Sequence, residues 1–513
     1  MNIVLPVILA VLHLCKSARI LGVIPTPSYS HQVIFQPLWK ELSLRGHQVT
    51  VLTTHPINDP TLTNLTEIDL GFSVKILEDK LLEIINSSSN VATEIELTAK
   101  VFQVVNDHQL QHPEVKRLID DPSEHFDLLI VELIMPSMTY FSRRFRCPYI
   151  GVVPFEGSNY LFRSIGQPAH SIVYPELFAG FYGELNLLER VQLIFYDVFV
   201  YILSLKVSAS EEELVWKHFR DKTPTDTVLQ EVSLLFVNSD PVFTYVRPLL
   251  PSVIPIGGTL ARVPVKPLDK ELLNFLDGAS KGFIYFSLGS NVKGKDLPSS
   301  TMKVILETFG KLPFKILWKY ELDDLPNKPS NVVIARWVSQ MEVLKHRNIR
   351  LFITHGGIHS MQEAIHARVP MVGMPFFVDQ PSNVKRMVAM GFARYVDYQT
   401  MTVDDFQSAV LDVIQNPKYR DRIRKLADLG EDQPTTGLER AVWWTEYVLR
   451  HKGAPHLRSP YLDIPWYQYY LLDIFAAILV PTILAILVII KLVRLIIWSV
   501  KRMWRRNLKL KSN

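Results

Sequence analysis

The residues best suited to bind a charged ligand lie in a 44-residue block from Trp337 to Gln380. At its centre, the strand-like run Phe352–Thr354 is followed by His355, Gly356 and Gly357, and then by a segment with helical spacing. The first turn of a helix leaves backbone N–H groups unpaired, and glycines let a ligand approach the backbone closely. This turn is therefore a candidate anion site, to which the neighbouring imidazole can donate a hydrogen bond.

A glycine turn between a strand and a helix is weak evidence alone, because many such turns use glycine only for packing. The same block adds one indole, two carboxamides and two carboxylates at defined distances from the turn. The set comprises Trp337, Gln340, Glu363, Asp379 and Gln380. Each has a structural alternative, because a tryptophan can fill a core and an aspartate can cap the next helix.

A second candidate group lies near the N-terminus. His31 follows the strand-like run Arg19–Pro25 and begins a segment of helical spacing that we predict over Gln32–Leu44. A helix N-terminus disfavours the imidazolium ion, so we expect a neutral imidazole near pH 7. A lone histidine is more often structural or merely exposed than catalytic. Another predicted strand, Phe126–Val131, is followed directly by Glu132.

Taken together, these motifs resemble the UDP-glycosyltransferase family, most closely its animal, insect-type members. The resemblance covers nearly the whole chain. It also includes Pro255–Gly258, Phe286–Ser290 and Trp466–Tyr469. It implies an α/β fold of two Rossmann-like, doubly wound domains that face each other across a cleft, the GT-B arrangement.

The same resemblance implies a role for each residue. Trp337 would stack on uracil, Gln340 would bond the edge of the base, and Glu363 would accept from the ribose hydroxyls. The residues implied for the diphosphate are Ser290, His355, Gly357 and Ser360, and those for the sugar are Asp379 and Gln380. His31 would be the base that activates the acceptor. Glu132 stands where the family has an aspartate that pairs with this base, and its extra methylene leaves the pairing distance open.

The order of strand-like and helix-like segments supports two α/β domains. Further strands are predicted at Gln48–Thr53, Tyr149–Val153 and Leu234–Val237 and, after a proline-containing segment, at Gly282–Leu288, Lys315–Lys319, Val332–Ala335, Arg350–Ile353 and Met371–Gly373. We predict an acceptor-binding domain over residues 18–261, a linker over 262–268 and a UDP-sugar-binding domain over 269–470. Ligands bind in such proteins at the carboxyl ends of the strands.

The two chain ends predict a membrane protein of the secretory pathway. Residues 1–17 have the apolar core and small residues of a signal peptide. Residues 471–493 are long and apolar enough for one transmembrane helix, and the basic tail 494–513 is then cytosolic by the positive-inside rule. Lys509 and Lys511 resemble a dilysine retrieval signal of the endoplasmic reticulum, with a solvated charge run as the alternative.

Charge and composition narrow the functional classes. The net charge is +4, and the eight lysines and arginines after residue 490, with no acidic residue among them, leave −4 on the rest of the chain. Because the folded part of the chain is therefore acidic, its charge argues against nucleic-acid binding, which needs basic residues on the folded domain. Cys147 is the only cysteine expected in the mature chain, so we expect no internal disulfide. Asn64 and Asn86 begin glycosylation sequons that suit a lumenal surface.

The expected activity is inverting transfer of a sugar, with UDP-glucose favoured, to a hydroxyl of a small lipophilic acceptor, as in detoxification. We expect no cofactor besides the UDP-sugar, and no metal, because the chain contains no Asp-x-Asp. Leu185–Val207 predicts a helix that is buried or lies on membrane lipid. Together with the nearby Phe155, Tyr160, Phe162, Phe178 and Tyr182 it can line an acceptor pocket, and plain core packing is the alternative. A homo-oligomer is possible. The alternative function is a non-catalytic protein that keeps the fold and binds a lipophilic ligand.

Overall fold

The computed structural model describes residues 17–87, 91–258 and 267–510. The predicted signal peptide except Ser17, all but the end of the predicted linker, and Lys511 lie outside these ranges. The chain divides after Arg458 into two compact units. The first contains an N-terminal half (residues 17–258) and a C-terminal half (residues 267–458), each built on one parallel sheet.

The sheet of the N-terminal half has the strand order β3-β2-β1-β4-β5-β6-β7, and all of its pairs are parallel. Its strands are β1 (Arg19–Val23), β2 (Gln48–Thr53), β3 (Leu65–Asp69), β4 (Leu128–Glu132), β5 (Tyr149–Val153), β6 (Leu234–Val237) and β7 (Val253–Pro255). Every residue of β4 and β5 is buried, as expected for strands covered on both faces. The order reverses between β1 and β4, which creates a crevice at their carboxyl ends.

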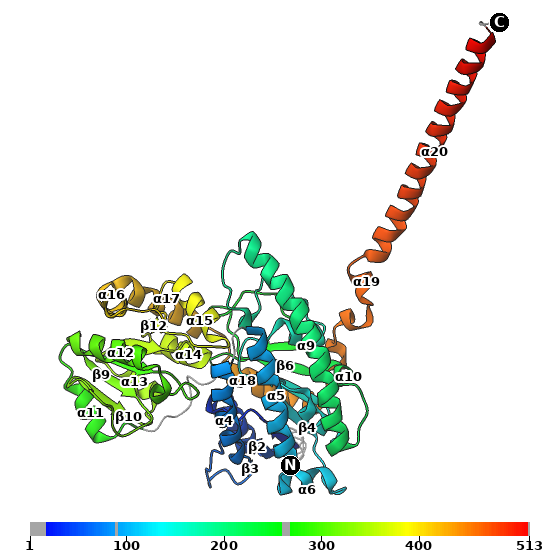
Figure 1. Cartoon of the computed structure of the whole chain (residues 1–513). Coiled ribbons are helices and arrows are strands. Elements are labelled where there is room, and N and C mark those ends of the chain that lie inside the picture. The colour runs from blue at the N-terminus through cyan, green and yellow to red at the C-terminus, as the bar shows by residue number, and fades with distance from the viewer. Residues whose placement is uncertain (1–16, 88–90, 259–266, 511–513) are drawn as a thin grey trace, which may run out of the picture. The chain divides into compact units, whose positions relative to one another are not determined.

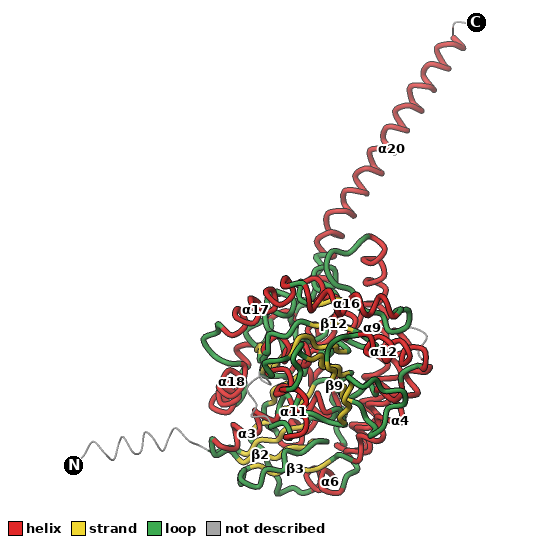
Figure 2. The backbone as a smooth tube through the Cα atoms, turned by 90° about the vertical axis from the view of Figure 1, so that its left-hand side faces the viewer, coloured by secondary structure: helices red, strands yellow, loops and turns green. Residues whose placement is uncertain are grey.

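The sheet of the C-terminal half repeats this plan with the order β10-β9-β8-β11-β12-β13, again parallel throughout. Its strands are β8 (Phe283–Ser287), β9 (Lys315–Lys319), β10 (Val332–Ala335), β11 (Ile349–Thr354), β12 (Met371–Gly373) and β13 (Ala393–Tyr395). Here the order reverses between β8 and β11. In Figure 2 the strands β9 and β12 of this sheet lie in the middle of the view, among helices that include α12 and α16.

Helices cover both sheets (Figure 1). Those of the N-terminal half are α2 (Tyr29–Val33), α3 (Gln36–Leu44), α4 (Phe72–Ser87), α5 (Val91–Leu110), α6 (Pro113–Asp120), α7 (Tyr140–Phe145), α8 (Asn159–Ser164), α9 (Leu187–Phe219) and α10 (Thr225–Gln230). Those of the C-terminal half are α11 (Lys270–Asp277), α12 (Ser299–Lys311), α13 (Gln340–Lys345), α14 (Ile358–His366), α15 (Gln380–Ala389), α16 (Val403–Gln415), α17 (Pro417–Glu431) and α18 (Gly437–His451).

The single helix predicted over Gln32–Leu44 is wrong in one respect, because the structure divides it into α2 and α3. Pro37, in the first turn of α3, has no backbone N–H to donate to the carbonyl of Val33 four residues earlier, so a continuous helix would lose that hydrogen bond. The break places His31 in a separate single turn beside the carboxyl end of β1.

The helix α18 belongs to the C-terminal half by sequence but packs on the first sheet. Ala441, Val442 and Val448 join the apolar core that contains Leu38 of α3 and Ile254 of β7. The chain therefore returns to its N-terminal half before the first unit ends.

In the part of the chain that the structure describes, two helices are long and apolar enough to cross a membrane, α9 and, in the second unit, α20 (Leu472–Leu510). The core-packing alternative for the Leu185–Val207 segment is wrong, because only 11% of the apolar window of α9 is buried. Its exposed large apolar side chains are Leu187, Leu188, Val191, Ile194, Phe195, Val198, Tyr201, Ile202 and Leu205. The second unit also contains the short helix α19 (Trp466–Tyr469).

Candidate active site

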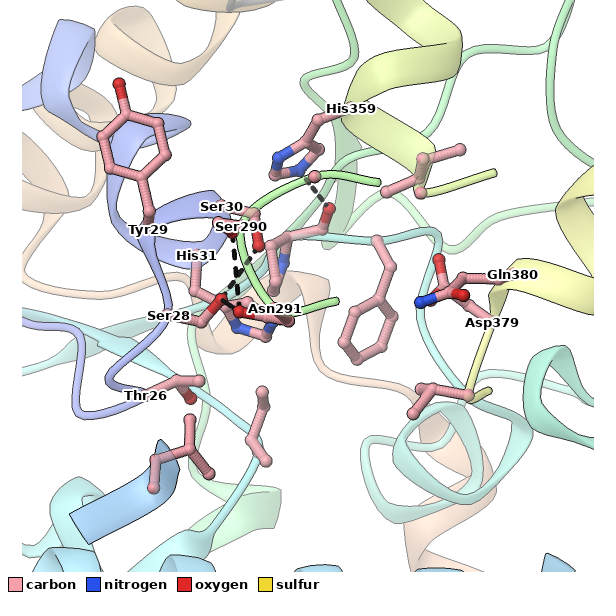
Figure 3. Close-up of a pocket in the computed structure, with 18 of the residues that line it drawn as sticks. Thr26, Ser28, Tyr29, Ser30, His31, Ser290, Asn291, His359, Asp379 and Gln380 are labelled. Atoms are coloured by element: carbon pink, nitrogen blue, oxygen red, sulfur yellow. Dashed lines mark hydrogen bonds between the residues drawn. The ribbon is translucent and has the colours of Figure 1, made fainter. Parts of the chain in front are cut away.

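A cleft of about 2270 Å³ lies where the carboxyl ends of the two sheets meet. Residues that follow β1, β4, β8 and β11 line it, so both points of strand reversal open into the same space. Figure 3 shows side chains from both halves in this cleft, among them Ser28 and His31 of the N-terminal half and Ser290 and Asn291 of the C-terminal half.

His31 and Glu132 form a hydrogen-bonded pair at the crevice of the first sheet. His31 Nδ1 lies 2.6 Å from Glu132 Oε1. The glutamate is fully buried, and its other oxygen accepts from the backbone N–H of Thr26 at 3.3 Å. The additional methylene of the glutamate therefore does not prevent the contact. Since a carboxylate can only accept, Nδ1 carries the proton, and Nε2 is left to accept one from a ligand in the cleft.

The predicted anion turn connects β11 to α14. Gly357 is the N-cap of α14, and no side chain caps the first turn. Gly356 has φ +87, and a Cβ there would approach Val384 to 2.4 Å, so the turn requires glycine. The N–H groups at the start of α14 therefore point toward the cleft without a side-chain competitor.

Two glycines hold the His355 ring at this turn. A Cβ on Gly289 would lie 2.5 Å from the ring and a Cβ on Gly357 would lie 2.7 Å from it. Burial, and then the charge of Lys319, lowers the pKa of His355 to about 4. The ring is therefore neutral at pH 7 and can donate one hydrogen bond, and its Nδ1 is buried without a partner among the described residues.

Trp337, Gln340, Ser360 and Glu363 come together next to this turn. Gln340 Nε2 donates to a Glu363 carboxylate oxygen and lies 3.2 Å from Ser360 Oγ. Burial raises the pKa of Glu363 to about 7, although the Gln340 hydrogen bond opposes the shift. Trp337 is 57% exposed, which leaves ring surface for a ligand. The Gln340 amide nitrogen is already engaged with these two side chains, so its predicted contact with the uracil edge stays a prediction.

Asp379 and Gln380 lie at the start of α15, across the cleft from His31 in Figure 3. Gln380 Oε1 accepts from the backbone N–H groups of Phe376 and Phe377 at 2.9 and 3.3 Å, which leaves its NH₂ group to donate to a ligand. Asp379 accepts from Asn383 at 2.7 Å, and burial raises its pKa. The preceding Val378 has φ +59, a strained value for a β-branched residue.

Sequence reasoning did not identify two polar residues beside these groups. Lys319 ends β9, donates to Gly289 O at 2.6 Å and lies 5.4 Å from the centre of the Trp337 ring. It places a cation beside His355 and the predicted diphosphate turn. Asn291 accepts from Ser28 of the N-terminal half at 3.1 Å, as the dashed line in Figure 3 shows. A lysine that ends an apolar strand was a usable signal for the first, whereas nothing local identified the second.

Buried polar contacts join the two halves at the inner end of the cleft. The guanidinium of Arg386 in α15 pairs with Glu156, which follows β5, at 2.7 Å, with side chains only 1% and 4% exposed. Gln362 of α14 and Asn238, which follows β6, exchange amide hydrogen bonds of 2.9 and 3.1 Å. His359, to which the sequence assigned no role, donates from Nε2 to Pro154 O at 3.0 Å. We refer to these three pairs as the inter-half interface.

The aromatic residues near α9 divide into two groups. Phe155, Tyr160 and Phe178 line the cleft, as the sequence suggested. Phe162 is instead fully buried in the core of the first half, and Tyr182 packs against Tyr245 and Arg386. Only part of the aromatic cluster can therefore contact an acceptor.

A model of the family described as UDP-glucoronosyl and UDP-glucosyl transferase matches residues 19–507. The chain belongs to this family. As a member of the family, it is a UDP-sugar-dependent glycosyltransferase.

Curated relatives cover this glycosyltransferase along almost its full length. The UDP-glycosyltransferase UGT5 of Dactylopius coccus is 31% identical over 92% of this chain and 91% of its own. The ecdysteroid UDP-glucosyltransferase of Spodoptera littoralis nuclear polyhedrosis virus is 34% identical over 93% and 97%. The human UDP-glucuronosyltransferase 2B7 is 29% identical over 92% of both chains.

Solved structures confirm the GT-B fold of the glycosyltransferase. The crystal structure of TcCGT1 in complex with UDP has a TM-score of 0.58 at 14% identity and covers 85% of this chain and 100% of its own. The glycotransferase of kitacinnamycin has a TM-score of 0.55 at 18% identity, with 85% and 99% covered.

The remaining site predictions concern modification and metals. Asn64 precedes β3 and donates through its amide to Ser43 O at 3.2 Å, whereas Asn86 lies within α4. Among the described residues, no group of three or more His, Cys, Asp or Glu side chains is arranged to hold a metal ion.

Proposed function

We propose that this glycosyltransferase inverts the anomeric configuration of the donor sugar and uses His31 as its general base. The observation that supports this most is the 2.6 Å contact between His31 Nδ1 and the buried Glu132 carboxylate. This contact fixes the tautomer in which Nε2 can accept a proton. The same pair argues against the non-catalytic alternative, because a protein that only holds a ligand has no need for an oriented base.

In the proposed step, Nε2 of His31 takes the proton of the acceptor hydroxyl while that oxygen bonds to the anomeric carbon. The bond from that carbon to the diphosphate oxygen breaks, and UDP leaves with the electron pair. Glu132 stabilises the imidazolium that forms. The start of α14, Ser290, His355 and Ser360 bind the leaving diphosphate, with Lys319 close by. General-base catalysis of this kind contributes about 10²- to 10⁴-fold.

Uridine is proposed to occupy the space beside Trp337. Its base stacks on the exposed indole, and its ribose hydroxyls donate to Glu363. Because Gln340 already donates to Glu363, we propose that it also orients this carboxylate. Asp379 and the NH₂ group of Gln380 would then bond the sugar hydroxyls.

UDP-glucose is the donor that we propose. UDP-glucuronate carries a carboxylate on its sugar, and no arginine, the side chain that can bind a carboxylate through two parallel hydrogen bonds, is among the described residues that line the cleft. Arg386 lies close to the sugar site but is committed to Glu156. Two of the viral relatives are named ecdysteroid UDP-glucosyltransferases.

A small lipophilic acceptor suits the part of the cleft between α5 and α9. Apolar side chains dominate its walls, among them Phe102, Met135, Tyr160, Val200 and Leu203. An apolar acceptor buried there gains about 25 cal/mol for each Å² removed from water.

We also propose that the chain is a membrane protein of the endoplasmic reticulum, with its catalytic halves in the lumen. The apolar α20 is its proposed transmembrane helix, and the basic residues after it favour a cytosolic tail. The exposed apolar face of α9 is proposed to lie on the membrane surface.

Purified microsomes that contain the full chain provide the test. They are supplied with a generic phenol and with UDP-glucose, UDP-glucuronate or another UDP-sugar, with and without EDTA. We expect most product from UDP-glucose, β-linked as inversion of an α-linked donor requires, and unaffected by EDTA. An α-linked product contradicts the inverting mechanism, and loss of activity with EDTA contradicts metal independence. UDP binding without turnover over a broad acceptor panel supports the non-catalytic alternative.

A further inference from the structure

Tyr29 belongs to the N-terminal half, two residues before His31, yet its ring contacts the C-terminal half. The ring centre lies 4.8 Å from that of Trp337, and the two planes meet at 84°, an edge-to-face pair. On its own half it lies 5.6 Å from the His55 ring, also edge to face. Tyr29 therefore bridges the cleft at the residue that we propose to bind uracil.

The groups next to Tyr29 suit a bound nucleoside better than an apolar acceptor. Burial, and then the nearby Glu363 carboxylate, raises the pKa of Tyr29. Its hydroxyl is therefore protonated at neutral pH and can donate a hydrogen bond. The side chain lies close to both the indole and the carboxylate that the proposed function assigns to base and ribose.

Space for a ligand remains beside this aromatic pair. Trp337 is 57% exposed even with Tyr29 in contact, so the indole retains surface on which a planar base can stack. Edge-to-face and offset-stacked arrangements are both favourable for aromatic rings. A base on Trp337 can thus contact Tyr29 without displacing either ring from the cleft.

We propose that Tyr29 is a donor-binding residue supplied by the N-terminal half, which contacts the nucleoside of the UDP-sugar bound on Trp337. This inference rests on the proposed function, because it requires uridine at Trp337. It adds a donor contact to a half whose predicted residues, His31 and Glu132, serve the acceptor.

The position of Tyr29 couples donor binding to the proposed general base, His31. Tyr29 and His31 share the single turn α2, and Ser28, which precedes it, donates to Asn291 of the donor half at 3.1 Å. Because the turn is short, a ligand that holds Tyr29 also restrains His31. Donor binding at the nucleoside site should therefore position the His31 imidazole before the acceptor hydroxyl reaches it.

The test compares ligand affinities of full-length variants by calorimetry. Tyr29→Ala should weaken UDP and UMP binding by about 3- to 10-fold, as expected for loss of one aromatic contact. Inorganic pyrophosphate should bind the variant as it binds the wild type, because the contact is to the nucleoside. Tyr29→Phe, which keeps the ring, should retain most of the affinity, and Tyr29→Leu provides a variant that keeps side-chain bulk if the alanine variant does not fold.

Phe102→Ala is the matched control, since Phe102 of α5 lines the apolar part of the same cleft between α5 and α9. It should raise the KM for a phenol and leave UDP affinity unchanged. If Tyr29→Ala and Tyr29→Leu bind UDP within twofold of the wild type, the inference is wrong, and a raised phenol KM would then place Tyr29 on the acceptor side. A wild-type chain that binds no UDP overturns the proposed function itself, which separates the two failures.

Discussion

The pair of His31 and Glu132 sets the chemistry at the scale of single residues. Each side chain follows or ends a strand at the reversal point of the first sheet, so the backbone brings them together from 101 positions apart in sequence. The glutamate accepts from a backbone N–H as well, which fixes its carboxylate before any ligand arrives.

Replacing the base should separate binding from catalysis. His31→Ala should bind UDP as the wild type does and lose acceptor glycosylation by at least about 10-fold, because general-base catalysis contributes about 10²- to 10⁴-fold. Glu132→Gln keeps the shape but removes the charge that stabilises imidazolium, so it should lower kcat without changing UDP affinity. Undiminished turnover in His31→Ala would remove the base assignment.

The raised pKa of Glu363 makes donor binding depend on pH. Its pKa is about 7, and ribose hydroxyls donate to the ionised carboxylate, so the ionised form should bind UDP more tightly. Affinity should therefore decrease as pH falls through 7, by about 5- to 10-fold between pH 8 and pH 6. Glu363→Gln should show only the dependence that belongs to UDP itself. Equal pH dependence in both proteins would contradict this role.

At the scale of elements, buried strands were predicted well because each is a continuous apolar run. β2, β5, β6, β9, β10 and β12 have the predicted bounds, and the others that were predicted differ by one or two residues at one or both ends. The strands that the sequence did not reveal, β3, β7 and β13, are all edge strands of their sheets. Edge strands contact one neighbour only, so their sequences need less continuous hydrophobicity.

The candidate site was predictable where side chains follow strands directly, and less so elsewhere. His31, Glu132, Ser290 and His355 all lie at the carboxyl ends of strands next to a reversal point, where an α/β sheet binds ligands. The contact between Ser28 and Asn291 depends on how two separate sheets face each other. No local pattern encodes that arrangement, and the same holds for the inter-half interface.

The loop after β8 packs against the turn after β11, where Gly289 and Gly357 both lie against the His355 ring. Gly289→Ala should weaken UDP binding by about 10-fold or more, because φ +78 disfavours alanine and its Cβ would lie 2.5 Å from His355. Gly310→Ala is the matched control, since its Cβ would meet nothing closer than 3.7 Å in the helix α12. The control should keep UDP affinity and be as stable as the wild type or slightly more so. Calorimetry with UDP and a thermal melt of each variant provide the measurement.

At the scale of the whole molecule, the inter-half interface should hold the two sheets in a fixed relation. Arg386→Met leaves Glu156 buried without its partner, and loss of one member of a buried pair costs about 3–5 kcal/mol. A clear decrease in melting temperature is expected. The double variant with Glu156→Leu should recover part of it, because the unpaired charge is gone.

Asp323→Asn, which breaks an exposed ion pair, is the control for the melting temperature of Arg386→Met. Asp323 bonds Arg336 in an ion pair whose side chains are largely exposed, so its loss should leave the melting temperature nearly unchanged. If Arg386→Met melts no lower than Asp323→Asn, the interface does not hold the halves together.

The exposed face of α9 makes a prediction about membrane attachment. A chain that ends at Tyr470, before α20, should still bind lipid vesicles, because α9 exposes large apolar side chains along most of its first half. Leu188→Asp, Phe195→Asp and Ile202→Asp together should release it in a flotation assay. Asp substitutions at Leu44 and Val246, two exposed apolar residues of other elements, should not. Release of the shortened chain without any substitution would contradict the role of α9.

The return of α18 to the first sheet has a consequence for dissecting the protein. A fragment that ends at Gly258 would lack Ala441, Val442 and Val448 and would expose apolar surface of α3 and β7 to water. Conversely, a donor-binding fragment that starts at Pro267 would carry α18 with its apolar side uncovered. Soluble pieces therefore require a cut before Gly437, with residues 437–458 supplied to the first fragment by fusion or in trans.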